Sequence, residues 1–527
     1  MAFTLYDSRQ RRLLDFQPRE PGKVSIYNCG PTVYSTGHIG NFRAFLFADV
    51  LRRHLEWRGF AVTQVMNITD VGHLTEDDRA DAAGEDKLQK KARELGWDPF
   101  RVARHFEDQF HADRRALNIQ DAHVYPRATE HICEMLAQVQ QLLDRGHAYI
   151  PEGSGEVYYD ISTFPDYGRL SGKKLDELRA GARVEVDEQK RHPGDFALWK
   201  VDPVHLMQWD PHAESTWRDR AEPRPRLDPK IGKGFPGWHI ECSAMSARYL
   251  GTEFDLHTGG EDNVFPHHEC EIAQAQGATG AEFARHWMHN RHLLVNGAKM
   301  SKSAGTLYTL ADILEKGFTA TELRYFLVTN HYRQPLNFTL EGLTAARSSL
   351  LRLQNARIAL SERAAASLGD VASLEPSPDV ADSIASFERD FGTGLDDDLN
   401  VSNAMAALFA FVSNIHRLEP APAGARAMLA ALDRADHVLG VLDRDAPKTG
   451  LIAAAELTAA GTESAKLDLA SLSARSITTE QLRQLAIARH QARQRKDWAT
   501  ADAIRDHLKK MGIVFADTPE GVRYTLP

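Results

Sequence analysis

The chain has 527 residues, a formal net charge of -10 and 43% hydrophobic residues. This apolar content is enough to bury a large core, and the length favours about three or four domains. The negative charge argues against indiscriminate binding to phosphate backbones, although one basic domain could still hold a nucleic acid. The first residues lack the apolar core of a signal peptide, and no run approaches the ~18 apolar residues of a membrane span. We therefore expect a cytoplasmic protein.

The four cysteines are Cys29, Cys133, Cys242 and Cys270. So few cysteines in so long a chain do not form a disulfide framework. Any cysteine with a function is therefore expected to act locally, as a thiolate that binds a metal or reacts.

The N-terminal part of the chain predicts a parallel sheet. Residues 24–30, "VSIYNCG", have the β-branched residues of a short strand, and residues 41–60 repeat apolar side chains at helical spacing. Residues 61–70, "AVTQVMNITD", are strand-like again. This order is typical of a Rossmann-type α/β domain that binds a nucleotide. Ligands of such sheets bind beyond the carboxyl ends of the strands, which is where residues 27–45 fall.

The next segments differ in composition. Residues 76–150 are charged and helical in pattern, and residues 151–237 are irregular, with Pro, Gly and Trp interspersed. Sheet elements return with "FDLHTG" and "HWMHNRHLLVNG". We therefore predict that the Rossmann-type domain spans residues 1–320 and carries an insertion at about 76–237.

Three further segments complete the chain. Residues 321–445 have wholly helical patterning and are expected to form a helical bundle. Residues 446–474 are rich in Ala, Ser, Thr and Gly and are expected to form a linker. Residues 475–527 form a small basic module, with ten Lys or Arg against six Asp or Glu. Such a modest excess is also compatible with a solvated helical hairpin.

The stretch "STGHIGN", residues 35–41, lies at the expected strand-to-helix turn. Bare glycines such as Gly37 and Gly40 let a triphosphate approach the backbone, and the helix N-terminus favours anions. His38 and Asn41 can donate hydrogen bonds to phosphate oxygens. The pattern alone is also compatible with a tight turn that carries a surface histidine.

A second stretch, "AKMSKSAGT" at residues 298–306, has two lysines and three hydroxyl groups. Lysine ammonium groups suit a phosphate tail, and Lys302 or Lys299 could stabilise the charge on a departing pyrophosphate. Taken alone, the stretch could equally be a solvated basic loop.

Three residues from the middle of the chain are candidate metal ligands. Cys242, His267 and Glu271 bring a thiolate, an imidazole and a carboxylate, which all bind zinc, and the last two have the i, i+4 spacing of one helix face. Cys29 could complete a set of four if the fold brings it near. In the structural alternative, His267 caps a helix, Glu271 is solvated and Cys242 is a small buried side chain.

Neighbouring residues with similar chemistry are interpreted differently. We predict that a helix starts at Pro266, and we interpret His268, Glu269 and Cys270 as decoys beside the candidate ligands. Cys133 is expected to be a core residue of an amphipathic helix.

The histidine turn and the later string "KMSKS" together resemble the paired signatures of class I aminoacyl-tRNA synthetases. The order of several further stretches is similar to that of cysteinyl-tRNA synthetases: "YNCGPTVY", "GHIGN", "NITDVG", "ALNI", "PRATEHI", "DFALWK", "GWHIECSAM", "FPHHECEIAQ", "LRYFLVTNHYR" and "LDDDLN". The likeness covers nearly the whole chain, because "RQRKDWATADAIRDHLKKMGIVFADTPEGVRYTLP" resembles that family's anticodon-binding module.

The resemblance implies roles for individual residues. The implied zinc ligands are Cys29, Cys242, His267 and Glu271. The implied catalytic groups are His38, Asn41, Lys299 and Lys302, and the implied ATP contacts are Gly37, His38, Gly40, Asn41 and Lys302. The implied cysteine pocket contains Gly30, Thr32, Trp238 and Asp262. The implied anticodon contacts are Arg493, Trp498, Asp502 and Asp517.

The resemblance also implies an ATP-dependent ligase. L-cysteine would react with ATP to give cysteinyl-adenylate and pyrophosphate, and the cysteine would then pass to the 3′ end of cysteine tRNA. One zinc ion per chain is expected to select the substrate thiolate, because pocket shape discriminates weakly and a protonated serine hydroxyl cannot match a Zn–S bond. Mg²⁺ is expected to accompany the ATP, and the resemblance implies a monomer that does not bind membranes.

Some features depart from the family pattern. Asn41 stands where the first signature usually has histidine. Asparagine keeps a hydrogen-bond donor at this position but has no ring that titrates. Residues 70–78, "DVGHLTEDD", replace the paired aspartates expected after "NITD", and residues 201–234 form a longer connection than usual. The sequence does not assign a function to either segment.

Two other functions are compatible with parts of the pattern. A cysteine ligase that acts on an amino sugar would share the zinc and nucleotide motifs but lack an anticodon module. A non-catalytic tRNA-binding relative would keep the fold without the activity, and Asn41 is the feature that hints at it. The lysine loop, the full set of zinc ligands and the C-terminal module favour the synthetase.

Overall fold

The structure of the chain is a computed structural model. It describes residues 3–76, 83–173, 189–218, 224–300, 306–365, 375–442, 449–453, 456–457, 479–518 and 521–525. Lys302, an expected ATP contact, lies outside the described residues.

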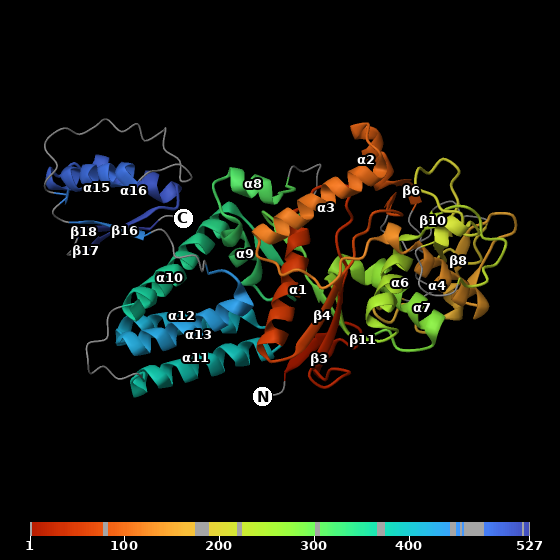
Figure 1. The fold of residues 1–527 in the computed structure, drawn as a ribbon, viewed down its shortest axis with the longest axis horizontal. Coiled ribbons are helices and arrows are strands. Elements are labelled where there is room, and N and C mark those ends of the chain that lie inside the picture. Colours follow the sequence, from red (N-terminus) through yellow and green to blue (C-terminus); the bar gives the residue numbers. More distant parts are fainter. Residues whose placement is uncertain are drawn as a thin grey trace.

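A parallel sheet forms the centre of the N-terminal region (Figure 1). Its strand order is β12, β11, β3, β4, and every neighbouring pair is parallel. The strands are β3 (Lys23–Asn28), β4 (Ala61–Met66), β11 (Phe254–Gly260) and β12 (Ala284–Asn290). Helix α1 (Ile39–Trp57) connects β3 to β4 and packs on the sheet. The predicted strand-helix-strand unit is confirmed, and the sheet returns after an insertion.

Helix α1 is stabilised by a cap at its N-terminus and by an apolar face along its length. His38 is the N-cap residue, and its Nδ1 accepts a hydrogen bond from the backbone N–H of Asn41 at 3.2 Å. In return, Asn41 Oδ1 accepts one from the backbone N–H of His38 at 3.0 Å. This reciprocal cap satisfies two donors at the helix start. Phe42, Leu46 and Val50 recur at helical spacing and are buried.

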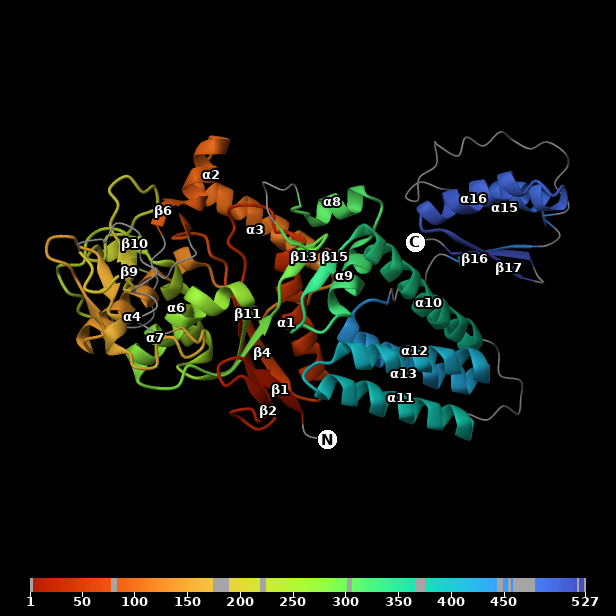
Figure 2. The same cartoon turned by 180° about the vertical axis from the view of Figure 1, so that it is seen from behind.

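The insertion between β4 and β11 contains a second sheet and several helices. This sheet is antiparallel with the order β10, β9, β8, β7, and its strands are β7 (Ala148–Tyr149), β8 (Val157–Tyr159), β9 (Phe196–Lys200) and β10 (Phe235–Pro236). The helices are α2 (Lys87–Leu95), α3 (Pro99–Ala116), α4 (Ile132–Asp144) and α6 (Trp238–Leu250). Strand β5 (Leu74–Glu76) pairs with β6 (Ala83–Asp86). Figure 2 shows α4, α6 and the second sheet on the far side of the central sheet from the C-terminus.

Shorter elements surround the central sheet. They are the hairpin of β1 (Thr4–Asp7) and β2 (Arg12–Asp15), and the single turns η1 (Ala128–Glu130), η2 (Ile161–Thr163), η3 (Glu214–Trp217) and η4 (Glu261–Asn263). The segment η5 (Val264–His268), which is kinked at the extended residue Phe265, precedes α7 (Glu269–Thr279). The α-helix therefore begins at Glu269, whereas the sequence predicted a helix start at Pro266.

A third small sheet follows β12. Strand β13 (Leu293–Val295) pairs antiparallel with β14 (Ala298–Lys299) and parallel with β15 (Leu336–Phe338). Helices α8 (Leu310–Glu315) and α9 (Ala320–Val328) lie between β14 and β15 in the chain. The small sheet therefore holds the segment just before residues 301–305.

The predicted helical bundle is present. Its helices are α10 (Leu340–Ala365), α11 (Pro378–Asp396), α12 (Val401–Leu418) and α13 (Pro422–Leu439). Helix α11 packs on α12 and α10 packs on α13, and α10 buries residues at helical spacing: Leu343, Ala346, Leu350 and Leu353. None of the helices in the described part of the chain is long and apolar enough to cross a bilayer.

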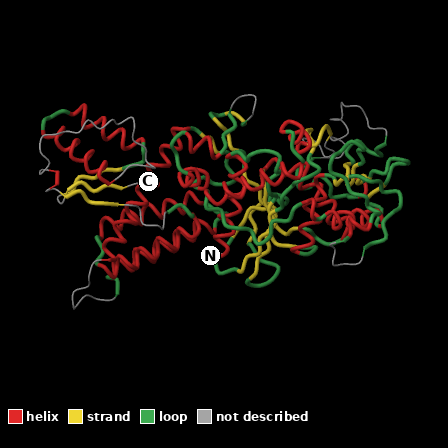
Figure 3. The backbone as a smooth tube through the Cα atoms, turned by 45° about the horizontal axis from the view of Figure 1, so that its top comes forward, coloured by secondary structure: helices red, strands yellow, loops and turns green. Residues whose placement is uncertain are grey.

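The C-terminal module has its own sheet and core. Helices α15 (Thr479–Gln494) and α16 (Trp498–Lys510) accompany an antiparallel sheet with the order β16, β18, β17. Its strands are β16 (Thr449–Ala453), β17 (Val514–Thr518) and β18 (Gly521–Thr525). Figure 3 shows this sheet as a separate group of strands. Strand β16 falls inside the segment predicted to be a linker, and it joins the sheet because Ile452 is buried in the module's core. Most other residues of that segment lie outside the described residues.

A buried arginine joins the central sheet to the bundle. Arg324 on α9 donates through Nη2 to Asp49 Oδ2 on α1 at 2.7 Å, and through Nε to the carbonyl of Leu439 at the end of α13 at 2.7 Å. Its Nη1 donates to the carbonyls of Leu117 and Asn118 at 2.9 and 2.8 Å. The interior tolerates this charge because a carboxylate and three carbonyls surround it.

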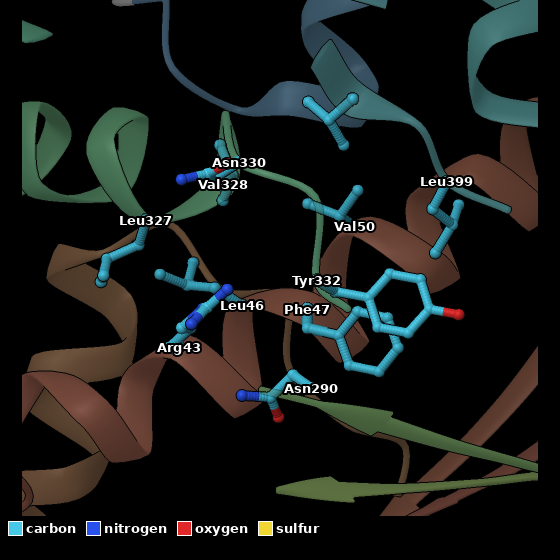
Figure 4. A pocket seen from close by; sticks show the side chains of 11 residues that line it. Arg43, Leu46, Phe47, Val50, Asn290, Leu327, Val328, Asn330, Tyr332 and Leu399 are labelled. Atoms are coloured by element: carbon cyan, nitrogen blue, oxygen red, sulfur yellow. The ribbon is translucent and has the colours of Figure 1, made fainter. Parts of the chain in front are cut away.

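A small apolar cavity lies at the same junction, between α1, the end of α9 and the start of α12 (Figure 4). Phe47 and Tyr332 stack in its wall, with ring centroids 4.4 Å apart. The cavity has a volume of about 20 Å³, which is room for about one water-sized molecule. We therefore assign it no substrate.

Replacing Arg324 should loosen the junction. We expect Arg324→Met to destabilise the fold by about 3 kcal/mol, because it leaves Asp49 and three buried carbonyls with fewer partners. The melting temperature in a calorimeter is the measurement, since a chain of several domains need not unfold in two states. Arg434→Met, which breaks a surface ion pair with Glu388, is the matched control and should change little. Equal melting temperatures for the two variants would contradict the prediction.

Candidate active site

The candidate site lies beyond the carboxyl ends of β3 and β11, where open α/β sheets bind ligands. Cys29 directly follows β3, and its backbone N–H donates to the carbonyl of Thr258 on β11 at 3.2 Å. Cys242 comes from α6, His267 from η5 and Glu271 from α7. Segments far apart in the sequence therefore meet at one edge of the sheet.

The structure brings the four candidate metal ligands together. One donor atom from each of Cys29, Cys242, His267 and Glu271 lies within 4.8 Å of all the others. Cys29 Sγ is 4.0 Å from Cys242 Sγ and 3.6 Å from Glu271 Oε1. His267 Nε2 is 3.0 Å from Glu271 Oε1. Cys29 is half-buried and the other three are buried.

This donor set fits a zinc ion. Both cysteines are free thiols, and their sulfurs lie 4.0 Å apart, far beyond the about 2.05 Å of a disulfide bond. Two sulfurs held at about 2.3 Å from one zinc at the tetrahedral angle would lie about 3.8 Å apart. Thiolate, imidazole and carboxylate are the ligand types of protein zinc sites. The group therefore has both the chemistry and the spacing that zinc requires.

Negative charge gathers in the group. Burial alone would raise the pKa of Glu271, but the charges of His257 and His267 lower it to about 2. Burial would likewise raise the pKa of Cys242, but its hydrogen bond with Cys29 and the charge of His267 lower it to about 6. Burial would lower the pKa of His267, yet Glu271 and Cys242 raise it to about 10. A carboxylate beside a thiolate favours a bound cation.

His257, on β11, orients the Glu271 carboxylate. Its Nε2 lies 2.8 Å from Glu271 Oε2, and both side chains are 0% exposed. This hydrogen bond leaves Oε1 facing Cys29 and His267. A histidine that holds the distal oxygen of a ligating carboxylate is a usual support in metal sites.

His268 is closer to the site than the sequence predicted. Its Nε2 lies 3.1 Å from Cys29 Sγ, and Cys29, His257, His268 and Glu271 form a second group of neighbouring donor atoms. The four predicted ligands form a complete donor group without His268, so its interpretation as a decoy stays a prediction. Burial and the surrounding histidines hold the pKa of His268 well below its usual range, so its ring is neutral.

The other predicted decoys make contacts elsewhere. Glu269 Oε2 accepts a hydrogen bond from the backbone N–H of Ser171 at 2.8 Å, and Cys270 Sγ lies 3.4 Å from the Tyr167 hydroxyl. Cys133 on α4 is half-buried against the core. These residues keep the structural roles that the sequence indicated.

Two more histidines extend the site, and sequence reasoning missed both. His239 Nδ1 lies 2.9 Å from His267 Nδ1, and His289 Nε2 lies 2.7 Å from His268 Nδ1. Burial lowers the pKa of His289 to about 3. A signal was present for His289, since "HWMHN" places histidines inside an otherwise apolar strand of a parallel sheet.

The residues expected to form the cysteine pocket lie near these donors. Trp238, the first residue of α6, stacks on His267 with ring centroids 4.4 Å apart. Gly30 has no room for a side chain, because a Cβ would lie 1.7 Å from the carbonyl oxygen of Asn67. Thr32 follows in the same connection from β3 to α1.

Asp262 lies farther out than the rest of the expected pocket. Its side chain is 67% exposed, and its carboxylate is 3.2 Å from His292 Nδ1 and 3.4 Å from Lys299 Nζ. Asp262 and Lys299 therefore form an exposed ion pair at the rim of the site.

The expected nucleotide turn lies at the N-terminus of α1. Gly40 packs against Met300, since a Cβ on Gly40 would lie 2.4 Å from Met300 Cε. His38 forms an isolated β-bridge with Thr309. Both sides of the segment that contains Lys302 are therefore held at this turn.

Asn41 and Gly37 have structural contacts in the same turn. Asn41 is exposed, and its amide oxygen is used in the helix cap with His38, which leaves its NH2 group for other partners. A Cβ on Gly37 would lie 3.3 Å from the ring of Phe42. Asn41 thus keeps the turn closed in a position where the family pattern has histidine.

Comparisons with known proteins identify the family. The description "tRNA synthetases class I (C) catalytic domain" matches residues 15–348, "DALR domain" matches residues 390–443 and "Cysteinyl-tRNA ligase anticodon binding domain" matches residues 479–524. The chain is 43% identical to a cysteine–tRNA ligase of Thermus thermophilus over 528 residues, which are 100% of both chains. It is 41% identical to one of Symbiobacterium thermophilum over 529 residues, 99% of both. The chain belongs to the cysteine–tRNA ligase family.

Solved structures of other class I synthetases share the fold of this family member. Methionyl-tRNA synthetase of Mycobacterium tuberculosis bound by methionyl-adenylate aligns with a TM-score of 0.52 and 15% identity, over 79% of this chain and 90% of that one. The LeuRS of an Agrobacterium radiobacter K84 complex aligns with a TM-score of 0.53 and 14% identity, over 81% and 86%. At such identities the likeness concerns the fold alone.

The C-terminal module matches the anticodon-binding domain of the cysteine–tRNA ligase family. Arg493 and Asp517 form an ion pair, and Asp502 Oδ1 lies 2.8 Å from Arg505 Nη1. Trp498 begins α16 and is 58% exposed. An exposed indole is a stacking surface for nucleic-acid bases. Contact of these residues with an anticodon stays a prediction.

Metal content should distinguish the two overlapping donor groups in this cysteine–tRNA ligase family member. We expect Cys242→Ser to lower zinc affinity by more than about 100-fold, because it removes a ligand, and His268→Gln by about 10-fold at most, because it removes a support. Zinc bound after dialysis against a chelator buffer, measured by atomic absorption, is the readout. Loss of zinc in His268→Gln but not in Cys242→Ser would assign the metal to the other group.

Proposed function

We propose that the chain activates L-cysteine with ATP and attaches it to cysteine tRNA. One observation carries the proposal: the clustered donors of Cys29, Cys242, His267 and Glu271 lie at the same sheet edge as the helix N-terminus capped by His38. The first feature suits a thiol substrate and the second a triphosphate. Full-length similarity to cysteine–tRNA ligases supports the same function.

Cysteine is selected by its sulfur. A zinc ion held by the four donors would offer a position that the substrate thiolate can take and the protonated hydroxyl of serine cannot. Glu271 is held through Oε2 by His257, and Trp238 stacks against His267 to form a wall beside the donors. Gly30 keeps the backbone beside them clear of side chains. Selection by sulfur chemistry exceeds the about 1–3 kcal/mol that pocket shape offers, so no editing site is needed.

ATP binds with its phosphates at the N-terminus of α1, accompanied by Mg²⁺. The helix N-terminus favours anions, and the NH2 group of Asn41 provides a donor there. Lys302 follows Met300, which packs against Gly40 of this turn, by two residues in the sequence. Its ammonium group supplies positive charge toward the departing pyrophosphate. Lys299 joins it when its exposed ion pair with Asp262 opens, because such pairs are weak.

The reaction has two balanced steps. An oxygen of the cysteine carboxylate attacks the α-phosphorus of ATP, the bond to the bridging oxygen breaks, and pyrophosphate leaves with that electron pair. A hydroxyl of the terminal ribose of the tRNA then attacks the carbonyl carbon, loses its proton, and AMP leaves. Both steps depend on positioning and on stabilising charge.

The alternatives have less support. An amino-sugar ligase is not favoured, because residues 479–524 match the anticodon-binding domain of cysteinyl-tRNA ligases. A non-catalytic relative does not require the complete group of zinc donors. The proposal includes a monomer that works in the cytoplasm, as the family resemblance implies.

Pyrophosphate exchange tests the function. Zinc-loaded protein should exchange labelled pyrophosphate into ATP when cysteine is present, and neither serine nor alanine should replace cysteine. Cys29→Ser should lower kcat/KM for cysteine by more than about 100-fold with little change in KM for ATP, because it damages only the thiol site. Exchange without charging of cysteine tRNA would favour the sugar ligase, and no exchange would favour the inactive relative.

Trp498 tests the role of the C-terminal module. Trp498→Ala should raise KM for tRNA in charging by about 5- to 100-fold, the value of one lost base stack, and leave cysteine-dependent exchange unchanged. Leu206→Ala, which shortens another exposed apolar side chain, is the control. An unchanged KM for tRNA would exclude Trp498 from the contact.

A further inference from the structure

His73 lies in the segment that departs from the family pattern, and the structure places it against the expected cysteine pocket. Its Nδ1 is 2.8 Å from Thr32 Oγ1, and its ring stacks on Trp238 with centroids 4.2 Å apart and planes 12° apart. Its Nε2 is 3.1 Å from Lys87 Nζ. His73 is 8% exposed. One buried ring therefore touches two pocket residues and a lysine.

Lys87 fixes the tautomer of His73. A lysine ammonium group has three donors and no acceptor, so the Nε2 that faces it must accept. The proton of the neutral ring then sits on Nδ1, which donates to Thr32 Oγ1. The opposite tautomer would point an N–H at the ammonium group. Lys87 thus sets the direction of the hydrogen bond between His73 and Thr32.

The direction of this bond decides what Thr32 can offer a substrate. A threonine hydroxyl has one proton and two acceptor lone pairs. Because His73 occupies a lone pair of Oγ1, the proton of Thr32 stays available to donate. Thr32 can therefore donate a hydrogen bond to an acceptor group of the substrate amino acid, such as its carboxylate or thiolate.

The position of Lys87 is built by several contacts. Lys87 is the first residue of α2, where the helix dipole disfavours a cation. Local helix preference therefore does not explain why a lysine stands at this position. Its backbone N–H donates to the carbonyl of His73 at 2.9 Å. Asp86 caps the same helix by accepting from the N–H of Gln89 at 2.9 Å, and Gln89 Oε1 accepts from the N–H of Leu206 at 2.7 Å. Leu206, in the long connection, thus supports the first turn of α2.

Trp238 stacks on two imidazoles. One belongs to His73, and the other belongs to His267, a candidate zinc ligand, with ring centroids 4.4 Å apart. Stacked rings of this kind restrict each other's orientation. His73 therefore fixes the wall of the pocket as well as its hydroxyl group.

We propose that His73, held in one tautomer by Lys87, is a positioning residue that orients Thr32 and Trp238 for recognition of the amino acid substrate. The inference rests on the proposed function and deepens it. It gives a role to both segments that depart from the family pattern, since one carries His73 and the other supports the helix that carries Lys87.

Variants of His73 separate its two contacts. His73→Phe keeps a stacking ring and loses both nitrogens, whereas His73→Asn keeps a donor near the position of Nδ1 and loses the ring. We expect His73→Phe to raise KM for cysteine in pyrophosphate exchange by about 10-fold, with zinc content and KM for ATP unchanged. His73→Asn should show a smaller rise, because its amide still donates to Thr32.

Double variants test the order of the contacts. Lys87→Met should raise KM for cysteine in the native background but have no effect in His73→Asn, which has no Nε2 to be oriented. His73→Phe should add nothing in a Thr32→Val background, since it acts through that hydroxyl. Lys90→Met, which removes an exposed lysine of the same helix, is the matched control and should match the native protein.

Each result decides the proposal. A KM for cysteine within about twofold of the native value in His73→Phe would overturn it, as would parallel losses of zinc, ATP binding and cysteine binding, which indicate a structural role. If His73→Phe does not fold, Lys87→Met in the native and His73→Asn backgrounds gives the same decision. Absence of exchange in the native protein would instead contradict the proposed function, so the two failures are distinguishable.

Discussion

Compensation of buried negative charge is the constraint on which the site depends. Two thiols and a carboxylate whose donor atoms lie within 4.8 Å cannot all stay ionised in the interior without positive charge beside them. His257 and His267 provide part of it by holding Glu271. Burial, Cys242 and Glu271 raise the pKa of Cys29 well above its usual range, so a bound cation is what would let both thiols ionise together. The sheet topology supplies the place for it, because strands β3 and β11 are neighbours and α6 and α7 return to the same edge.

In the proposed function, the connection from β3 to α1 serves both substrates. Cys29 begins it among the metal donors, Thr32 lies in its middle, and His38 ends it as the cap of α1. A displacement of this connection would change the thiol site and the phosphate site together. At its start the connection passes close to the backbone of Asn67, where Gly30 leaves no space for a side chain.

Local patterns in the sequence predicted the parts that depend on local physics. Residues 24–70 gave a strand-helix-strand unit through their periodicity, and Cys242, His267 and Glu271 stood out because their side chains share zinc chemistry. His257 and His289 could not be assigned in this way, because their role comes from burial in neighbouring strands. The contact of His268 with Cys29 joins residues 239 positions apart in the sequence, so no local pattern predicted it. The contact of His73 with Thr32 joins two loops, and no sequence period connects them.

Strand β16 determines which residues an isolated C-terminal module must include. Strand β18 lies between β16 and β17, so each of its edges is covered by a partner. A fragment that starts at residue 475 would omit β16 and leave one edge of β18 with unpaired backbone groups, a template for joining other chains. An isolated module would therefore need to begin at or before Thr449, so that both edges of β18 stay paired.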